Sequence, residues 1–78
     1  MINIKQYLKQ LDKETLKKLF KISELDELEY WVLYYGFAEK RMVENTCMKL
    51  NISRAYYFII KNKAMIKVHF KIKEIKKV

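Results

Sequence analysis

The chain has 78 residues, of which 51% are hydrophobic and 33% charged, and its formal net charge is +8. This length suits one domain, 1–78, and the lack of Pro and the single Gly predict helices with few loops rather than a disordered tail. No apolar run approaches the roughly 18 residues of a membrane span, and no signal-peptide pattern opens the chain. We therefore expect a protein that does not enter a membrane. The lone Cys47 can form no internal disulfide, which fits a reducing cytoplasm.

The excess positive charge lies in the second half of the chain. Residues 1–40 hold seven lysines and seven acids, whereas residues 41–78 hold ten basic residues and two acids. An uneven distribution of this kind favours a polyanionic partner. The alternative is that lysines keep a small protein soluble, which explains the amount of charge but not its placement.

The N-terminal segment, 1–22, predicts two short helices. The first has an apolar side, and Asp12 is placed to cap the N-terminus of the second. The apolar side of the first helix consists of Ile4, Leu8 and Leu11, and that of the second of Leu16, Leu19 and Phe20. The intervening lysines are expected to face water.

A more apolar helix is predicted next, within ELDELEYWVLYYGF. Ser23 is the candidate N-cap, with Asp26 at the reciprocal third position, and Gly36 is expected to end the helix. Acids crowd its first turn, where they favour the helix dipole. Because no His lies near them and the capping role explains them, we expect no metal site and no bound cofactor.

The stretch AEKRMVENTCMKL predicts a further helix that stops at Asn51, a residue that tolerates left-handed backbone. Val43, Cys47 and Leu50 share its inner face, and Cys47 is small enough to allow a close helix crossing. Lys40 and Arg41 are expected in its first turn.

A second helix is expected after this turn. Ser53 is its candidate N-cap, Ile52 and Tyr57 are spaced for a hydrophobic staple, and Tyr57, Ile60 and Ala64 form its inward face. Two helices joined in this way predict a helix-turn-helix, whose second helix enters the major groove of DNA. The alternative is a helical hairpin with no DNA role.

The DNA contacts are assigned from position. Arg54 lies at the end that enters the groove, and Arg paired with guanine is the commonest specific contact, while Lys40 and Arg41 suit phosphates. The full set of expected contacts is Lys40, Arg41, Ser53, Arg54, Ala55, Tyr56, Phe58, Ile59, Lys61, Asn62 and Lys63.

Residues 28–68 resemble the promoter-reading module of bacterial sigma factors, the region-four type. LYYGF at 33–37 is similar to the end of its lead helix, LNISR at 50–54 to its turn, and KNKAMIK at 61–67 to the basic end of its recognition helix. Short phage regulators of late transcription, the ArpU-like group, are similar at the same places. The resemblance implies that Arg54, Ala55, Phe58 and Ile59 face bases.

Phe58 and Ile59 depart from that resemblance, because the family more often has polar groups there. Three explanations compete. The two side chains contact thymine methyls, or the C-terminal segment or a second copy covers them, or they form an apolar patch that binds another protein.

After Ala64 the pattern is ambiguous. Residues 66–73 alternate like an extended strand, yet Met65, Val68, Ile72 and Ile75 also fit a helical stripe. The resemblance favours helix to about Val68. The basic tail, 69–78, contains Lys71, Lys73, Lys76 and Lys77 and would strengthen phosphate binding, and His69 has no partner at ligand spacing.

These inferences predict an all-α protein, a small bundle of four to five helices with a helix-turn-helix core at 23–68 and a C-terminal tail that is either helical or extended. We expect a sequence-specific transcription regulator of phage or bacterial type, not an enzyme. It would bind double-stranded DNA and gain specificity as a homodimer or on RNA polymerase. The alternative is a protein-interaction module, such as a phage-encoded inhibitor or adaptor of a host complex, that uses Phe58 and Ile59.

Overall fold

The computed structural model describes residues 3–75 and shows an all-α protein, as predicted. Five α-helices and one π-helical turn account for its regular structure, and no strand occurs in this range. The elements are α1 (Ile4–Lys9), α2 (Lys13–Ile22), α3 (Glu27–Leu33), η1 (Tyr34–Ala38), α4 (Val43–Leu50) and α5 (Arg54–Ile75). Within the described range, no helix combines the length and the apolar character needed to cross a bilayer.

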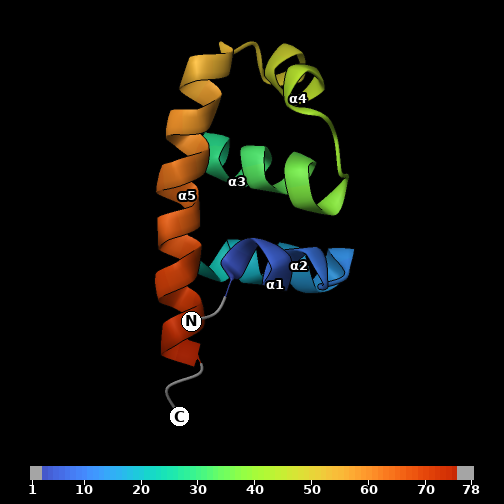
Figure 1. Cartoon of the computed structure of the whole chain (residues 1–78). Coiled ribbons are helices and arrows are strands. Elements are labelled where there is room, and N and C mark those ends of the chain that lie inside the picture. Colours follow the sequence, from blue (N-terminus) through green and yellow to red (C-terminus); the bar gives the residue numbers. More distant parts are fainter. Residues whose placement is uncertain (1–2, 76–78) are drawn as a thin grey trace.

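The 22-residue helix α5 is the axis of the molecule. Figure 1 shows the other helices stacked along one side of it, with α4 beside its N-terminal end, α3 beside its middle and α1 and α2 beside its C-terminal half. The molecule measures 40 × 22 × 21 Å, so its length is set by α5. Both ends of α5 are therefore held by different parts of the chain.

Two hydrophobic clusters lie against α5. The upper cluster joins α3, α4 and the start of α5 through Val32, Cys47, Tyr57 and Ile60. The lower and larger cluster joins α1, α2, α3, η1 and the remainder of α5, and its buried members are Leu8, Leu16, Leu19, Phe20, Leu33, Phe37, Ala64, Val68 and Ile72. The apolar stripes predicted for the two N-terminal helices and for the start of α5 are confirmed by this packing.

The helix ends show which predicted caps form. Asp12 caps α2, since its Oδ1 accepts from the Thr15 N–H at 2.8 Å. The prediction that Ser23 caps the next helix is wrong, because Ser23 closes α2 and donates its hydroxyl to the Leu19 carbonyl at 2.7 Å. Asp26 caps α3 instead. The Asp26 side chain accepts from the Glu29 N–H at 2.8 Å, and the Glu29 side chain accepts from the Asp26 N–H at 2.9 Å, which is a reciprocal capping box.

The prediction that Gly36 ends the central helix is also wrong. The helix continues through the π-helical turn η1, in which Gly36 lies at a negative φ, and the left-handed residue comes four positions later at Lys40, with φ 53°. As a result α4 begins only at Val43, so Lys40 and Arg41 lie in the loop before it rather than in its first turn.

The choice between helix and strand after Ala64 is decided in favour of helix. Val68 and Ile72 continue the buried stripe of α5 at a spacing of four, and the lower cluster covers them, whereas the alternating residues Ile66 and Phe70 lie on the exposed side of the helix. Lys71 and Lys73 of the expected basic tail belong to α5, whereas Lys76 and Lys77 lie outside the described residues.

Candidate nucleic-acid interface

A sharp turn separates α4 from α5. Asn51 adopts left-handed backbone, with φ 57° and ψ 49°, and its N–H donates to the Met48 carbonyl. The next N–H, that of Ile52, donates to the Cys47 carbonyl at 3.0 Å, which closes the end of α4. Ser53 then caps α5, its Oγ accepting from the Tyr56 N–H at 3.1 Å. The predicted turn, its left-handed Asn and its Ser cap are therefore all present.

Cys47 lies where α4 crosses α5. It is buried in one cluster with Tyr57 and Ile60, and its thiol approaches the Ser53 carbonyl at 3.9 Å. Leu50 and Ile52 pack against the same cluster from either side of the turn. The close crossing fixes the start of α5 relative to α4.

The first turn of α5 is exposed. Arg54, Ala55 and Tyr56 all face solvent, and the guanidinium of Arg54 pairs with Glu44 of α4 while its carbon Cζ lies 5.8 Å from the centre of the Phe58 ring. Both partners of the ion pair are more than 60% exposed, and such pairs contribute little to stability. The pKa of Glu44 is held below its usual value by its own backbone N–H and by Arg54. An incoming phosphate or base could thus replace Glu44 at little cost.

Phe58 and Ile59 are 39% and 52% exposed. The explanation that the C-terminal segment covers them is wrong for the described residues, since that segment continues α5 away from them up to Ile75. Thymine methyls, a second copy and another protein remain as explanations. Ile66 and Phe70 are exposed further along the same helix, at 57% and 61%.

The remaining predicted contacts fall into two groups. Asn62 and Lys63 are exposed on α5, as expected. In the loop before α4, Lys40 is exposed, while Arg41 is held by Glu39 at 2.7 Å and by the Asn45 side chain at 2.6 Å, with its guanidinium 5.3 Å from the centre of the Tyr35 ring. Arg41 therefore has a fixed direction before any ligand binds.

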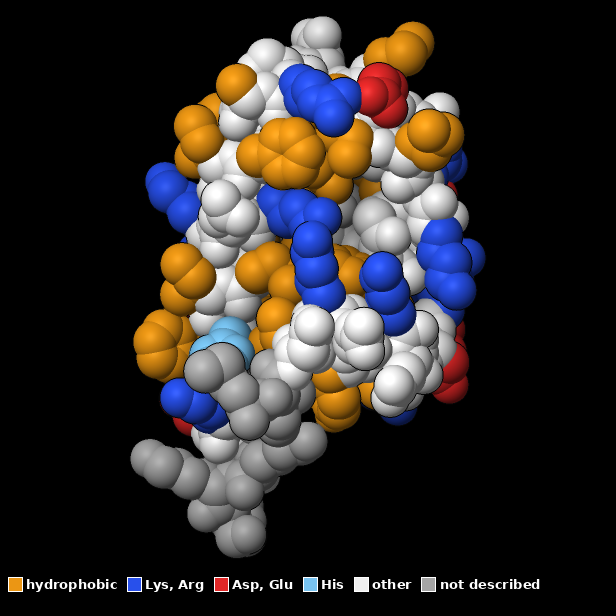
Figure 2. All heavy atoms as spheres, in the orientation of Figure 1, with side chains coloured by type: hydrophobic (Ala, Val, Ile, Leu, Met, Phe, Trp, Pro, Cys, Tyr) orange, Lys and Arg blue, Asp and Glu red, His pale blue; other side chains and the backbone are white. Residues whose placement is uncertain are grey.

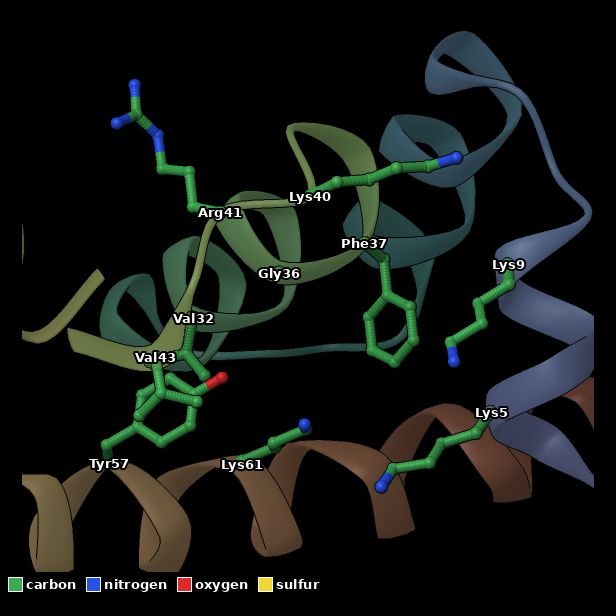
Figure 3. A pocket seen from close by; sticks show the side chains of 10 residues that line it. All are labelled: Lys5, Lys9, Val32, Gly36, Phe37, Lys40, Arg41, Val43, Tyr57 and Lys61. Atoms are coloured by element: carbon green, nitrogen blue, oxygen red, sulfur yellow. The ribbon is translucent and has the colours of Figure 1, made fainter. Parts of the chain in front are cut away.

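Lys61 does not face outward as predicted. It is partly buried, and its Nζ lies 5.8 Å from the ring centres of both Phe37 and Tyr57, in a pocket between α1, η1 and α5 (Figure 3). Burial lowers its pKa. Lys63, two residues later on the same helix, is exposed.

Two features of this region were missed in the sequence. Glu44 has no special pattern, and only the fold brings it opposite Arg54. Lys5 and Lys9 line the pocket with Lys61, and their spacing of four, which puts both on one side of a helix, was the available signal.

Comparisons of this chain with protein-family models, with curated proteins and with solved structures find no match.

Proposed function

We propose that this chain is a DNA-binding transcription regulator of phage or bacterial type, in which α4 and α5 act as a helix-turn-helix and α5 enters the major groove. The proposal rests on one observation. The left-handed turn at Asn51 and the cap at Ser53 leave Arg54, Ala55 and Tyr56 exposed at the very start of a long helix. The first residues of a recognition helix are those that reach base edges.

The charges around this helix support the proposal. Ten of the seventeen basic residues lie after residue 40, and only Glu44 and Glu74 oppose them there. Lys63 and Asn62 extend the exposed polar surface beyond the first turn of α5. In this proposal the lysines bind phosphates. Arg54 leaves its ion pair with Glu44 and donates hydrogen bonds to the edge of a guanine instead.

The test is a fluorescence anisotropy titration with duplexes selected from a random library, repeated from about 50 to 200 mM salt. A chain that neutralises Z phosphates gives log K a slope of about −0.9Z against log salt. Arg54→Ala should cost the preferred duplex about 1–3 kcal/mol and flatten sequence preference, whereas Lys63→Ala should weaken all duplexes alike. Lys18→Ala, an exposed charge change on α2, serves as the matched control. Absence of binding at the lowest salt would refute the proposal.

A protein this small makes few contacts with DNA, so we propose that it gains specificity as a homodimer or by docking on RNA polymerase in the cytoplasm. Size-exclusion chromatography with light scattering, with and without duplex, measures the first possibility. One chain per particle, both free and in the complex with duplex, would leave polymerase docking as the source of specificity.

A second candidate function is protein interaction, as in a phage-encoded inhibitor or adaptor. The observation that favours it is the exposure of Phe58, Ile59, Ile66 and Phe70 along α5. Exchange of Phe58 and Ile59 for Gln should leave DNA affinity intact if these side chains serve a protein partner. A loss of DNA affinity in that variant would place the pair at the DNA instead.

A further inference from the structure

A pocket of about 380 Å³ opens between α1, the η1 turn and the middle of α5. Three of its lysines come from segments far apart in the sequence, Lys5 and Lys9 from α1 and Lys61 from α5. Figure 3 shows their side chains directed toward a common space beside the ring of Phe37. Figure 2 shows Lys and Arg side chains gathered around hydrophobic ones near the centre of the same face, with acidic side chains toward its edges.

Of the described residues, none that lines this pocket is acidic. Within residues 3–75, the ion pairs use Arg41, Arg54, Lys67 and Lys71 as cations, so none of the three pocket lysines has a carboxylate partner there. This arrangement differs from the usual surface, on which charges of both signs alternate. Among the described residues the pocket therefore has cations without a paired anion, and an anionic ligand would compensate their charge.

Lys61 shows the electrostatic consequence. Its pKa is lowered first by burial and then by repulsion from Lys5 and Lys9. A charge that is partly buried among like charges destabilises its own site unless an anion compensates it. Several negative charges close together would convert the mutual repulsion of three ammonium groups into attraction.

The rest of the lining defines what fits. Lys40 and Arg41 also line the pocket, but Figure 3 shows their cationic groups directed away from the space beside Phe37, and Arg41 is held by Glu39. Val32, Phe37 and Tyr57 contribute an apolar wall. The volume lies in the range of small-ligand sites, roughly 300–1,000 Å³.

We propose that this pocket binds a small oligophosphate, of the inorganic triphosphate or nucleoside triphosphate class. Linked phosphates carry several negative charges in a row, and lysine ammonium groups bind phosphate as point charges. A single carboxylate or sulfate would compensate fewer of the lysines. The site does not depend on the DNA-binding proposal, because it is built from α1, η1 and the middle of α5 rather than from the exposed first turn of α5.

The test is isothermal titration calorimetry with sodium triphosphate and with ATP, and with AMP and sulfate at matched ionic strength. Triphosphate and ATP should bind, and AMP and sulfate should bind much more weakly. Lys61→Gln, and separately the Lys5→Gln, Lys9→Gln double variant, should lower triphosphate affinity about fivefold. Lys63→Gln is the matched control, since it makes the same charge change two residues away on the exposed side of α5, and it should leave affinity unchanged.

Folding is checked by thermal melting followed by circular dichroism. Lys61→Gln removes a partly buried charge that its neighbours repel, so its melting temperature should not fall. Triphosphate at about ten times its dissociation constant should raise the melting temperature of the unaltered chain by about 6–11 °C, and that of Lys61→Gln by less.

Three results would overturn the proposal. Triphosphate does not bind at about 50 mM salt, the condition at which phosphate contacts are strong. Lys63→Gln weakens binding as much as Lys61→Gln does, which would mean general charge attraction. Or Lys61→Gln weakens duplex binding as much as it weakens triphosphate binding, which would assign the lysines to a nucleic-acid backbone. Triphosphate binding by a chain that binds no duplex would instead support this pocket and refute the DNA-binding proposal.

Discussion

At the scale of single residues, three turns within residues 3–75 contain a residue with left-handed backbone, and only one of these residues is of a type that favours this conformation. Glu24, Lys40 and Asn51 have φ values of 58°, 53° and 57°. For most residues this conformation costs about 1–2 kcal/mol. After glycine, Asn adopts it most readily, because its short polar side chain can form local hydrogen bonds. Asn51 was therefore recognisable in the sequence, whereas nothing in the side chains of Glu24 and Lys40 marks their backbone.

Asn51→Ala should lower the free energy of unfolding by about 1 kcal/mol, because alanine keeps the steric cost of left-handed backbone without the local hydrogen bonding of asparagine. Asn51→Gly should be nearly neutral, since glycine adopts this conformation freely. Urea unfolding followed by circular dichroism measures both. Equal losses in the two variants would show that the Asn side chain, rather than its backbone, holds the turn.

At the scale of elements, the join between α3 and η1 decides where the following loop begins. The helix does not end at Gly36 but continues for two residues to Ala38 in π-helical geometry. The left-handed residue comes only at Lys40. Phe37 thereby enters the lower cluster and Lys40 reaches the pocket edge. The glycine at the end of this apolar run does not reveal whether packing of the following side chains stabilises an extension of the helix.

Gly36→Ala tests this assignment directly. A Cβ at Gly36 would meet the Tyr57 hydroxyl oxygen at 3.9 Å, which is ordinary contact, and the φ of Gly36 is negative. Since glycine inside a helix costs roughly 0.5–1 kcal/mol relative to alanine, the variant should be more stable by about that amount. A strong loss of stability in urea unfolding would mean that Gly36 needs a conformation that only glycine adopts.

At the scale of the whole molecule, one buried carboxylate links the middle of the stack to its axis. Glu29 of α3 is 3% exposed, and its Oε1 accepts a hydrogen bond from the Lys67 ammonium of α5 at 2.7 Å. The same Oε1 also accepts from the Asp26 N–H in the capping box. The hydrogen bond that Lys67 donates to Glu29 raises the pKa of Lys67. The pair thus joins α3 to α5.

Lys67→Met should lower the urea midpoint at pH 7, because it leaves the Glu29 carboxylate buried without its cation. Lys63→Met, an exposed lysine one turn earlier, is the matched control and should change little. Because the folded-state pKa of Lys67 is raised, the contribution of the pair is complete at neutral pH and is lost only as the pH rises through that alkaline value. Equal midpoints for the two variants would show that the pair is not needed to hold α3.

The sequence by itself determined the local features: the all-α class, the apolar stripes of the N-terminal helices and of α5, the Asp12 cap and the turn at Asn51 and Ser53. Each depends on residues within about one helical turn of one another, so their spacing and their capping residues can be recognised in the sequence. Only the tertiary structure decided that α5 runs unbroken to Ile75, that Lys61 turns inward and that Lys5 and Lys9 join it. Those outcomes depend on which distant segments pack together, and a single apolar stripe does not specify the helix that will cover it.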